Sequence, residues 1–333
     1  MQALVLHAPK MLAHEPAWPE PEPAEGWAVV KVLASGICGS DLPRIQQTGM
    51  YAPHLIPGHE FSGVVSASRS NEVVVGQPVA VLPIIPCGHC PGCRIGPFHC
   101  TQYDFIGSRR DGGFAEYCAV PGPNLLPLPA NITAEEGAFV EPLAVGLHVL
   151  RRAQIRPGGR TLVLGGGAIG ILIAQWAGIF GAAEVTLADV RDASLAVAAA
   201  CGVTQAVNVH AEAFDRLGEF DVIFEAAGAN QALQAAIAHA AHRGTIVVVG
   251  REVSDTLVPL KRMEQMMRKE IDLKGCWGYD LADDRKFLLD VLAAGRLTIS
   301  PMITRRISLQ AGAAAIQEMW DKSFFYCKVM FTF

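Results

Sequence analysis

Four cysteines form the densest group of reactive side chains in the sequence, with the spacing Cys87-x2-Cys90-x2-Cys93-x6-Cys100. Four thiolates so close together can surround one ion tetrahedrally, and a closed shell of sulfur is typical of structural zinc. An iron–sulfur cluster is compatible with the same spacing, whereas a redox C-x-x-C pair would need a βαβ setting that this stretch lacks. We therefore predict a structural zinc, with His89 and His99 as bystanders.

A glycine-rich loop is the second group that points to chemistry. The residues Gly165-Gly166-Gly167-Ala168-Ile169-Gly170 fit the pattern G-x-G-x-x-G, follow a predicted strand and open a predicted helix. Gly165 permits a tight turn, Gly167 lets the backbone approach a pyrophosphate, and Gly170 lets the helix pack close to the strand. The helix that Ala168 and Ile169 open offers N–H groups to phosphates. The loop therefore predicts a dinucleotide site.

An acidic residue, Asp189, ends the next predicted strand. A carboxylate there would accept hydrogen bonds from ribose hydroxyls and repel a 2′-phosphate, which favours NAD over NADP. Arg191 leaves an alternative open, because it could accept a 2′-phosphate or stack on adenine. A glycine-rich turn with no nucleotide is the other alternative, and the combination of strand, helix and acid argues against it.

The elements that must position these groups change in character along the chain. Up to about residue 140, short β-rich runs are separated by Gly, Pro and Asn, at 27–33, 61–67, 78–82 and 114–120. From about 145, strands at 161–164, 184–188, 206–209, 222–225, 245–249 and 273–277 alternate with helices at 168–180, 193–201 and 231–241, and a helix at 285–294 follows. Such a βαβ series predicts a parallel sheet covered on both faces.

Length and composition exclude several classes of protein. A chain of 333 residues has room for two domains. A hydrophobic content of 51% with 18% charged residues excludes disorder and a coiled coil. The net charge of −5 argues against a nucleic-acid partner. The nine cysteines are an odd number and are clustered, which favours metal binding over a disulfide framework.

One apolar stretch, Thr161–Ala183, has the length of a membrane-spanning helix. Its glycines split it into a short strand and a helix, so we expect core elements and no membrane partner. The N-terminus has no long apolar segment typical of a signal peptide. We expect a cytoplasmic protein with reduced thiols.

Two further segments, Cys38-Gly39-Ser40-Asp41 and Gly58-His59-Glu60-Phe61-Ser62-Gly63, mean little singly, because a lone Cys or His is more often a core residue than a ligand. Together with Glu141-Pro142 and the four cysteines they form a known pattern. The chain resembles the zinc-dependent medium-chain alcohol/polyol dehydrogenases over essentially its whole length. The resemblance is carried by four blocks, Cys38–Ile45, Gly58–Gly63, Tyr103–Tyr117 and Glu141–His148, and the block Tyr103–Tyr117 indicates a subgroup that acts on polyol phosphates.

The resemblance implies an α/β protein with a GroES-like β-rich catalytic domain plus a doubly wound parallel-sheet Rossmann domain. We place the catalytic domain at 1–144, with a structural zinc lobe at 87–100. The NAD-binding domain then spans 145–281, and residues 282–333 return to the catalytic domain. The implied cofactors are NAD and two zinc ions per chain, one catalytic and one structural.

The resemblance also implies roles for single residues. Cys38, His59 and Glu141 would be ligands of the catalytic zinc, with one position left open. Glu60 would be the adjacent carboxylate, which can approach the metal or hold its water. Asp41 would orient His59, although Asp at such a place is also common as a turn or cap residue.

The implied reaction transfers a hydride from a secondary alcohol of a polyol phosphate to NAD, as in the conversion of galactitol 1-phosphate to tagatose 6-phosphate. Zinc lowers the pKa of a bound water from 15.7 to about 7, and we expect it to acidify an alcohol similarly. Ser40 would be the first proton acceptor, and Leu42 and Pro43 stand where some relatives have relay histidines. Arginine suits phosphate, so we predict Arg110 as its partner, with Arg44 as the second choice and a plain surface arginine as the alternative.

Two other functions remain open at this point. One is a sorbitol/iditol- or threonine-type zinc dehydrogenase acting on a non-phosphorylated substrate. The other is a non-enzymatic regulator that binds NAD and zinc, although a regulator has no need of a complete open metal set. The resemblance further implies a homodimer or homotetramer, formed through the edge of the parallel sheet or through the zinc lobe.

Overall fold

In the computed structural model the chain forms two compact units, and the structure describes residues 1–155, 157–251 and 255–333. Unit 1 contains Met1–Glu141, Ala282–Ala294 and Ile303–Phe333, and unit 2 contains Pro142–Leu281 and Gly295–Met302. The segment Gly295–Met302, which the sequence analysis places in the final return, therefore groups with unit 2. Within the described ranges no helix is both long and apolar enough to cross a membrane.

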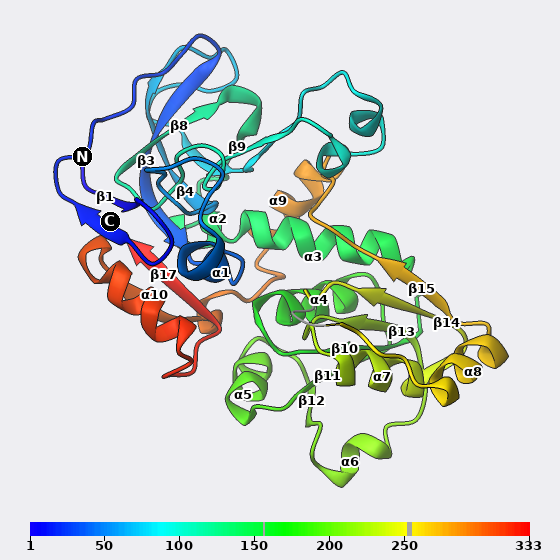
Figure 1. Cartoon of the computed structure of the whole chain (residues 1–333). Coiled ribbons are helices and arrows are strands. Elements are labelled where there is room, and N and C mark those ends of the chain that lie inside the picture. Colours follow the sequence, from blue (N-terminus) through cyan, green and yellow to red (C-terminus); the bar gives the residue numbers. More distant parts are fainter. Residues whose placement is uncertain (156, 252–254) are drawn as a thin grey trace. The chain divides into compact units, whose positions relative to one another are not determined.

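Unit 2 contains a six-stranded parallel sheet (Figure 1) with the strand order β12-β11-β10-β13-β14-β15. This order is that of the doubly wound dinucleotide-binding fold, so the predicted Rossmann domain is confirmed. The strands are β10 (Arg160–Leu164), β11 (Glu184–Asp189), β12 (Gln205–Asn208), β13 (Phe220–Glu225), β14 (Ala240–Val248) and β15 (Asp272–Gly275). The helices are α3 (Val140–Ala153, which starts in unit 1), α4 (Ala168–Ile179), α5 (Asp192–Ala200), α6 (Glu212–Asp215), α7 (Asn230–His239) and α8 (Leu260–Lys269).

Apolar residues fill the space between this sheet and its helices. α4 packs on β10 and β11, and α7 packs on β13 and β14. Side chains such as Leu162, Ile223 and Ile246 are fully buried, as expected for strands that are covered on both faces. The indole of Trp176 is also buried and donates a hydrogen bond of 3.2 Å to the carbonyl of Leu143. The sheet is thus a rigid base for the loops at its carboxyl edge.

Unit 1 is built on a seven-stranded sheet with the order β16-β17-β3-β4-β5-β9, in which β8 also pairs with β3. This sheet belongs to the predicted GroES-like domain. Its strands are β3 (Trp27–Gly36), β4 (Glu60–Ser68), β5 (Pro78–Val81), β8 (Tyr117–Pro121), β9 (Leu125–Pro127), β16 (Ile303–Ile307) and β17 (Lys328–Thr332). Two further antiparallel pairs are β1 (Ala3–Leu6) with β2 (Leu12–Glu15), and β6 (Ile84–Ile85) with β7 (Asp104–Phe105). The α-helices of unit 1 are α1 (Asp41–Pro43), α2 (Ala134–Ala138), α9 (Arg285–Ala293) and α10 (Gly312–Trp320).

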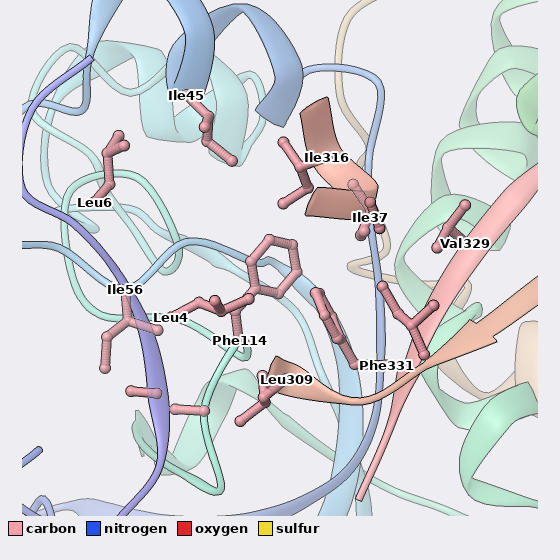
Figure 2. Packing of buried hydrophobic residues seen from close by; sticks show 14 of the residues in the cluster. Leu4, Leu6, Ile37, Ile45, Ile56, Phe114, Leu309, Ile316, Val329 and Phe331 are labelled. Atoms are coloured by element: carbon pink, nitrogen blue, oxygen red, sulfur yellow. The ribbon is translucent and has the colours of Figure 1, made fainter. Parts of the chain in front are cut away.

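One core of unit 1 gathers both ends of the chain around the segments that carry the reactive residues (Figure 2). The rings of Phe114 and Phe331 meet edge to face with 4.8 Å between their centroids. Ile37 is part of the same core and directly precedes Cys38. Gly58 has a φ of +96°, and a Cβ there would lie 2.3 Å from the Phe114 ring. The packing of this core therefore fixes the backbone that carries Cys38 and His59.

The strand predicted at 114–120 starts three residues late, at Tyr117. Phe114 is turned into the core instead, and its backbone N–H donates to the carbonyl of Pro57 at 3.0 Å. Gly112 and Gly113 also bond to the Ile56–Gly58 backbone. Because these contacts take up the backbone groups of 112–114, the segment cannot join the ladder with β3.

Candidate functional site

The four cysteines of the zinc lobe converge on one point. Their sulfur atoms all lie within 4.8 Å of one another. The Sγ–Sγ distance is 3.8 Å between Cys87 and Cys93 and 3.5 Å between Cys90 and Cys93. Zn–S bonds of about 2.3 Å in a tetrahedron place the sulfur atoms roughly 3.8 Å apart. The cluster therefore has the dimensions of a structural zinc shell.

Two short 3-10 turns, η2 (Pro91–Arg94) and η3 (Pro97–His99), form the loop between these cysteines. A Cβ at Gly92 would lie 1.9 Å from the carbonyl oxygen of His99. Only glycine therefore allows the two turns to touch, which lets Cys100 reach the other three sulfurs. His89 is exposed and its Nδ1 lies 2.8 Å from the carbonyl oxygen of Cys87.

Backbone donors make this cluster ready for a cation. N–H groups of Thr101 and Cys93 lower the pKa of Cys90 to about 5. Burial opposes ionisation of Cys100, but the N–H groups of Cys87 and Gln102 outweigh it and lower the pKa of that thiol. Burial and the neighbouring thiols raise the pKa of Cys93 to about 12. Because thiolates repel one another, a bound cation is what would allow all four to ionise.

A second group with metal-ligand chemistry consists of Cys38, His59 and Glu60, whose ligand atoms also lie within 4.8 Å of one another. Cys38 follows β3, and His59 directly precedes β4. The two strands are antiparallel, with Gly36 opposite Glu60, so the end of one strand meets the start of the other. A thiolate, an imidazole and a carboxylate in this arrangement fit a catalytic zinc that keeps an open position.

Asp41 contacts the first two of these residues, the imidazole of His59 and the backbone of Cys38. Its carboxylate is fully buried, with Oδ1 3.2 Å from Nδ1 of His59, and Oδ2 accepts the backbone N–H of Cys38 at 3.0 Å. Burial alone would lower the pKa of His59, but Asp41 and Cys38 outweigh it and raise that pKa well above its ordinary value. With Nδ1 facing Asp41, Nε2 is the ring nitrogen left for a metal. The geometry supports the predicted orienting role, which stays a prediction.

Lys328 is the residue at this group that the sequence analysis missed. Its ammonium lies 2.5 Å from Glu60 Oε2, and both side chains are almost completely buried. Burial alone would lower the pKa of Lys328, but the Glu60 carboxylate outweighs it and raises that pKa above its ordinary range. Strand β17 places the lysine there by pairing with β3, with Met330 opposite Gly36. No local sequence signal links residues so far apart.

Glu141, the third predicted ligand, lies at the start of α3 and is buried. Burial raises its pKa to about 7, while His59 nearby pulls it down and Glu60 pushes it up. The pKa of Glu141 therefore depends on the charges of His59 and Glu60. The mutual 4.8 Å set, however, contains Glu60 and not Glu141. The ligand role of Glu141 stays a prediction, with Glu60 as the other carboxylate available.

Ser40 lies beside the sulfur of Cys38. Its hydroxyl donates a hydrogen bond of 3.3 Å to Cys38 Sγ, and its Oγ accepts one of 3.4 Å from Arg44 Nη1. Arg44, the second candidate for phosphate, is thus placed next to the metal-ligand group. Leu42 and Pro43 follow in α1 and offer no side chain that could carry a proton. The role of Ser40 as first proton acceptor stays a prediction, and its neighbours in sequence supply no second relay step.

Arg110, the first candidate for phosphate, is engaged elsewhere in unit 1. It forms an ion pair with Asp104, and its guanidinium lies over the ring of Trp27 with 5.2 Å to the centroid. It lines a cavity of about 320 Å³ together with Trp18 and Tyr117. None of Cys38, His59 or Glu60 lines that cavity.

The glycine loop in unit 2 has the geometry of a phosphate cradle. Gly165 has a φ of +109°, and a Cβ at Gly170 would lie 1.8 Å from its carbonyl oxygen. A Cβ at Gly167 would meet no described residue within 4 Å, so the described part of the chain leaves space in front of the loop. No side chain caps the start of α4 at Ala168, which leaves its first N–H groups for an anion. The residues fit the pyrophosphate of a dinucleotide.

Asp189 ends β11 directly beneath this loop. Its Oδ2 accepts the N–H of Gly166 at 2.6 Å, and its Oδ1 accepts the N–H of Arg191 at 2.8 Å. The Arg191 guanidinium Nε also lies 3.4 Å from Oδ1. These bonds hold the Asp189 carboxylate at the carboxyl end of β11. Each of its oxygens has a second lone pair, which can accept a hydrogen bond from a ribose hydroxyl. The roles of Asp189 and Arg191 stay predictions.

An open metal set and a closed lobe of four cysteines in unit 1, with a doubly wound sheet and its glycine loop in unit 2, define a class of protein. That class is the zinc-dependent oxidoreductases that use a nicotinamide dinucleotide. Comparison with known proteins agrees. The family model described as "Alcohol dehydrogenase GroES-like domain" matches residues 24–130, and that described as "Zinc-binding dehydrogenase" matches residues 168–294.

Individual relatives narrow the class. Galactitol 1-phosphate 5-dehydrogenase of Escherichia coli (strain K12) is 34% identical over 304 residues, covering 87% of this chain and 88% of the relative. L-idonate 5-dehydrogenase of Vitis vinifera is 31% identical, covering 84% of this chain and 80% of the relative. Sorbitol dehydrogenase of Bacillus subtilis (strain 168) is 30% identical, covering 95% and 93%. The chain belongs to the zinc-dependent medium-chain alcohol/polyol dehydrogenase family.

Solved structures show the same fold. The galactitol-1-phosphate dehydrogenase of Escherichia coli matches with a TM-score of 0.90 at 33% identity, covering 100% of both chains. A zinc-binding dehydrogenase from Sinorhizobium meliloti 1021 bound to NADP matches with a TM-score of 0.90 at 29% identity, covering 99% of this chain and 98% of the other. A short chain alcohol dehydrogenase from Escherichia coli CFT073 complexed with NADH matches with a TM-score of 0.89 at 30% identity, covering 100% and 99%.

Proposed function

We propose that this protein is an NAD-dependent dehydrogenase that oxidises a secondary alcohol of a polyol phosphate of the galactitol 1-phosphate type. The observation that carries the reaction is the group Cys38, His59 and Glu60 with the Ser40 hydroxyl beside the thiolate. The polyol phosphate is supported by the 34% identity to galactitol 1-phosphate 5-dehydrogenase.

The preference for NAD rests on Asp189. Its carboxylate is fixed at the end of β11 by two backbone N–H groups. A negative charge held there would repel the 2′-phosphate of NADP and accept hydrogen bonds from the ribose of NAD. The Arg191 guanidinium lies against the Asp189 carboxylate. The carboxylate offsets part of its positive charge, so Arg191 would attract the 2′-phosphate of NADP less strongly.

The side chains divide the chemistry among them. Cys38 and His59, with Glu60 or Glu141, would hold the catalytic zinc, and the four lobe cysteines would hold the structural one. A zinc ion in the first site supplies a Lewis acid, which makes an alcohol hydroxyl easier to deprotonate. Asp41 would orient the imidazole, and Ser40 would accept the substrate proton at Oγ while its own hydroxyl proton passes on to solvent. The Arg44 guanidinium donates to that oxygen, which would orient the hydroxyl and favour release of the proton that it passes on.

Replacing Ser40 with alanine should lower kcat by about 10²-fold, the lower end of what general acid–base groups contribute. The acidic limb of the pH–rate profile should change with it, because a different group must then take the proton. The matched control is Ser66→Ala, because the Ser66 hydroxyl donates to the carbonyl of Val29 and belongs to neither metal-ligand group. Stopped-flow and steady-state rates over pH 5–10 are the measurement, and an unchanged kcat and profile would rule out the relay role.

A substrate panel tests the proposed function as a whole. kcat/KM should be measured with NAD and NADP for galactitol 1-phosphate, galactitol, sorbitol, L-idonate and L-threonine. We expect the phosphate ester to exceed galactitol by at least tenfold, with NAD preferred. Equal kcat/KM for galactitol 1-phosphate and galactitol would favour the sorbitol-type alternative, and a preference for L-threonine would favour the threonine type. If the protein binds two zinc ions and turns over none of the five substrates, the non-enzymatic regulator is favoured.

The partner chain that we propose is a second copy of this protein. Strand β15 is an edge of its sheet, and Leu273 in it and Trp277 just after it are exposed. Helix α8, which contacts the neighbouring strand β14, exposes Leu260, Met263 and Met267. A row of exposed apolar residues beside an open edge strand is typical of an interaction surface. Light scattering should give the mass of a homodimer or homotetramer, and Leu273→Lys should reduce it.

A further inference from the structure

We propose that Arg109 is the cation that recognises the anionic end of the substrate. The inference rests on the proposed function, because it names the residue that would select a phosphorylated or carboxylated polyol over a neutral one. Arg109 lies in the same arginine-containing turn as Arg110, but its surroundings differ in each respect that matters for binding an anion.

The turn that carries Arg109 is fixed by its backbone. N–H groups of Arg109 and Arg110 both donate to the carbonyl of Phe105, at 2.9 and 3.2 Å. The N–H of Tyr51, from the loop before His59, donates to the carbonyl of Ser108 at 3.2 Å. These bonds tie together the two loops whose side chains meet at Arg109. The backbone of Arg109 is therefore held in place by the protein itself, without a ligand.

Among the described residues, the guanidinium of Arg109 contacts two aromatic rings and makes no side-chain hydrogen bond. Its Cζ lies 4.1 Å from the ring centroid of Tyr51 and 4.7 Å from that of Tyr103. Cation–π contacts of this kind orient the guanidinium plane without using its N–H donors. A planar fork held in this way is suited to bind two oxygens of a phosphate or carboxylate at once.

The charge of Arg109 has no acid to offset it among the described residues. The described part of the chain contains no ion pair that involves this arginine, and its Nε is buried without a hydrogen-bond acceptor. Removing a charged donor from water without giving it a partner costs free energy. An anion at the terminal nitrogens would not reach Nε, but it would offset the positive charge that the guanidinium shares among its three nitrogens. The site is therefore suited to an anionic ligand.

A ladder of rings connects this cation to the metal-ligand group. The rings of Tyr103 and Phe105 lie 6.5 Å apart, and the ring of Phe105 meets the imidazole of His59 with 5.6 Å between centroids. In this series of contacts, the side chains of Tyr103 and Phe105 link Arg109 to His59. In a polyol 1-phosphate that reacts at carbon 5, four carbon–carbon bonds separate the reacting carbon from the carbon that carries the phosphate ester. The recognising cation must therefore stand away from the metal.

The two other arginines meet this requirement less well. Arg44 donates to Ser40, which itself contacts the Cys38 sulfur, so it lies beside the reacting end. Arg110 already pairs with Asp104. Arg109 combines an uncompensated charge, a fixed plane and a position removed from the metal-ligand group.

The experiment compares Arg109→Gln with Arg110→Gln and with the exposed Arg216→Gln as a neutral control. kcat/KM is measured for galactitol 1-phosphate, L-idonate and galactitol, and inorganic phosphate is tested as a competitive inhibitor. We expect Arg109→Gln to reduce kcat/KM for the anionic substrate at least about tenfold, as expected for loss of a charge-assisted pair. The value for galactitol should change less than twofold, and inhibition by phosphate should weaken in parallel. Zinc content and thermal unfolding confirm that each variant is folded.

The outcomes separate this inference from the proposed function. If the wild type prefers the phosphate ester and Arg109→Gln retains that preference, the inference is wrong and the proposed function stands. Loss of the preference in Arg110→Gln alone would also overturn the inference. If the wild type instead prefers L-idonate and Arg109→Gln removes that preference, the proposed phosphate substrate fails but the anion role of Arg109 stands. A wild type that treats neutral and anionic polyols alike overturns both.

Discussion

Replacing Cys38 with alanine should remove one of the two zinc ions that the chain can hold and lower kcat by at least about 10³-fold. Cys38 supplies the thiolate of the open metal-ligand group. Its loss leaves an imidazole and a carboxylate that already pairs with Lys328. A metal Lewis acid contributes several kcal/mol to a transition state, and each 1.36 kcal/mol is a factor of ten in rate. Metal analysis by mass spectrometry and NADH formation are the measurements.

The matched control for this variant is Cys276→Ala. Cys276 is a half-buried thiol outside both metal groups, and burial raises its pKa to about 11. This variant should retain both zinc ions and its kcat. The prediction fails if Cys38→Ala keeps two zinc ions, or if it loses one and still turns over at the wild-type rate.

Replacing Lys328 with methionine should destabilise the folded protein by about 3–5 kcal/mol, the usual cost of removing one partner of a buried ion pair. The variant leaves the Glu60 carboxylate, 2% exposed, without its 2.5 Å partner. Methionine has a similar length and adds no cavity of consequence, so the effect would come from the unpaired charge. Urea unfolding followed by tryptophan fluorescence measures it.

A double variant distinguishes this explanation from simple loss of packing. Glu60→Gln combined with Lys328→Met removes both charges, and we expect it to recover more than half of the stability lost in Lys328→Met. A double variant as unstable as the single one would show that the lysine stabilises by packing alone. Because Glu60 belongs to the metal-ligand group, these experiments are carried out on protein of known zinc content.

Much of unit 2 could be predicted from the sequence because its signals are local. The predicted strand 161–164 and helix 168–180 correspond to β10 and α4 within one residue at each end. Both are bounded by the glycine loop, whose residues differ sharply from their neighbours. By contrast, α8 (Leu260–Lys269) was not predicted. Its apolar residues Leu260, Met263 and Met267 have helical spacing, but charged and polar residues dominate the segment and none of its residues is buried.

Unit 1 was less predictable because its strands owe their limits to distant partners. Phe114 has a strand-forming side chain and still leaves the ladder, because Gly58 makes room for its ring. The C-terminal segments 303–307 and 328–332 carry no turn motif that predicts their pairing. They join the sheet only because β3 presents a free edge to β17.

The sequence by itself determined the two kinds of chemistry in this protein. Four cysteines within one short loop can meet without help from the rest of the chain, and a glycine loop between a strand and a helix carries its own geometry. Only the tertiary structure decided which charges are offset. Lys328 reaches Glu60 across 268 positions of sequence, Arg110 finds Asp104, and Arg109 finds two tyrosines and no acid among the described residues. The physical reason is that coordination spacing is a short-range property of the backbone, whereas the partner of a charge depends on which distant strands and loops pack beside it.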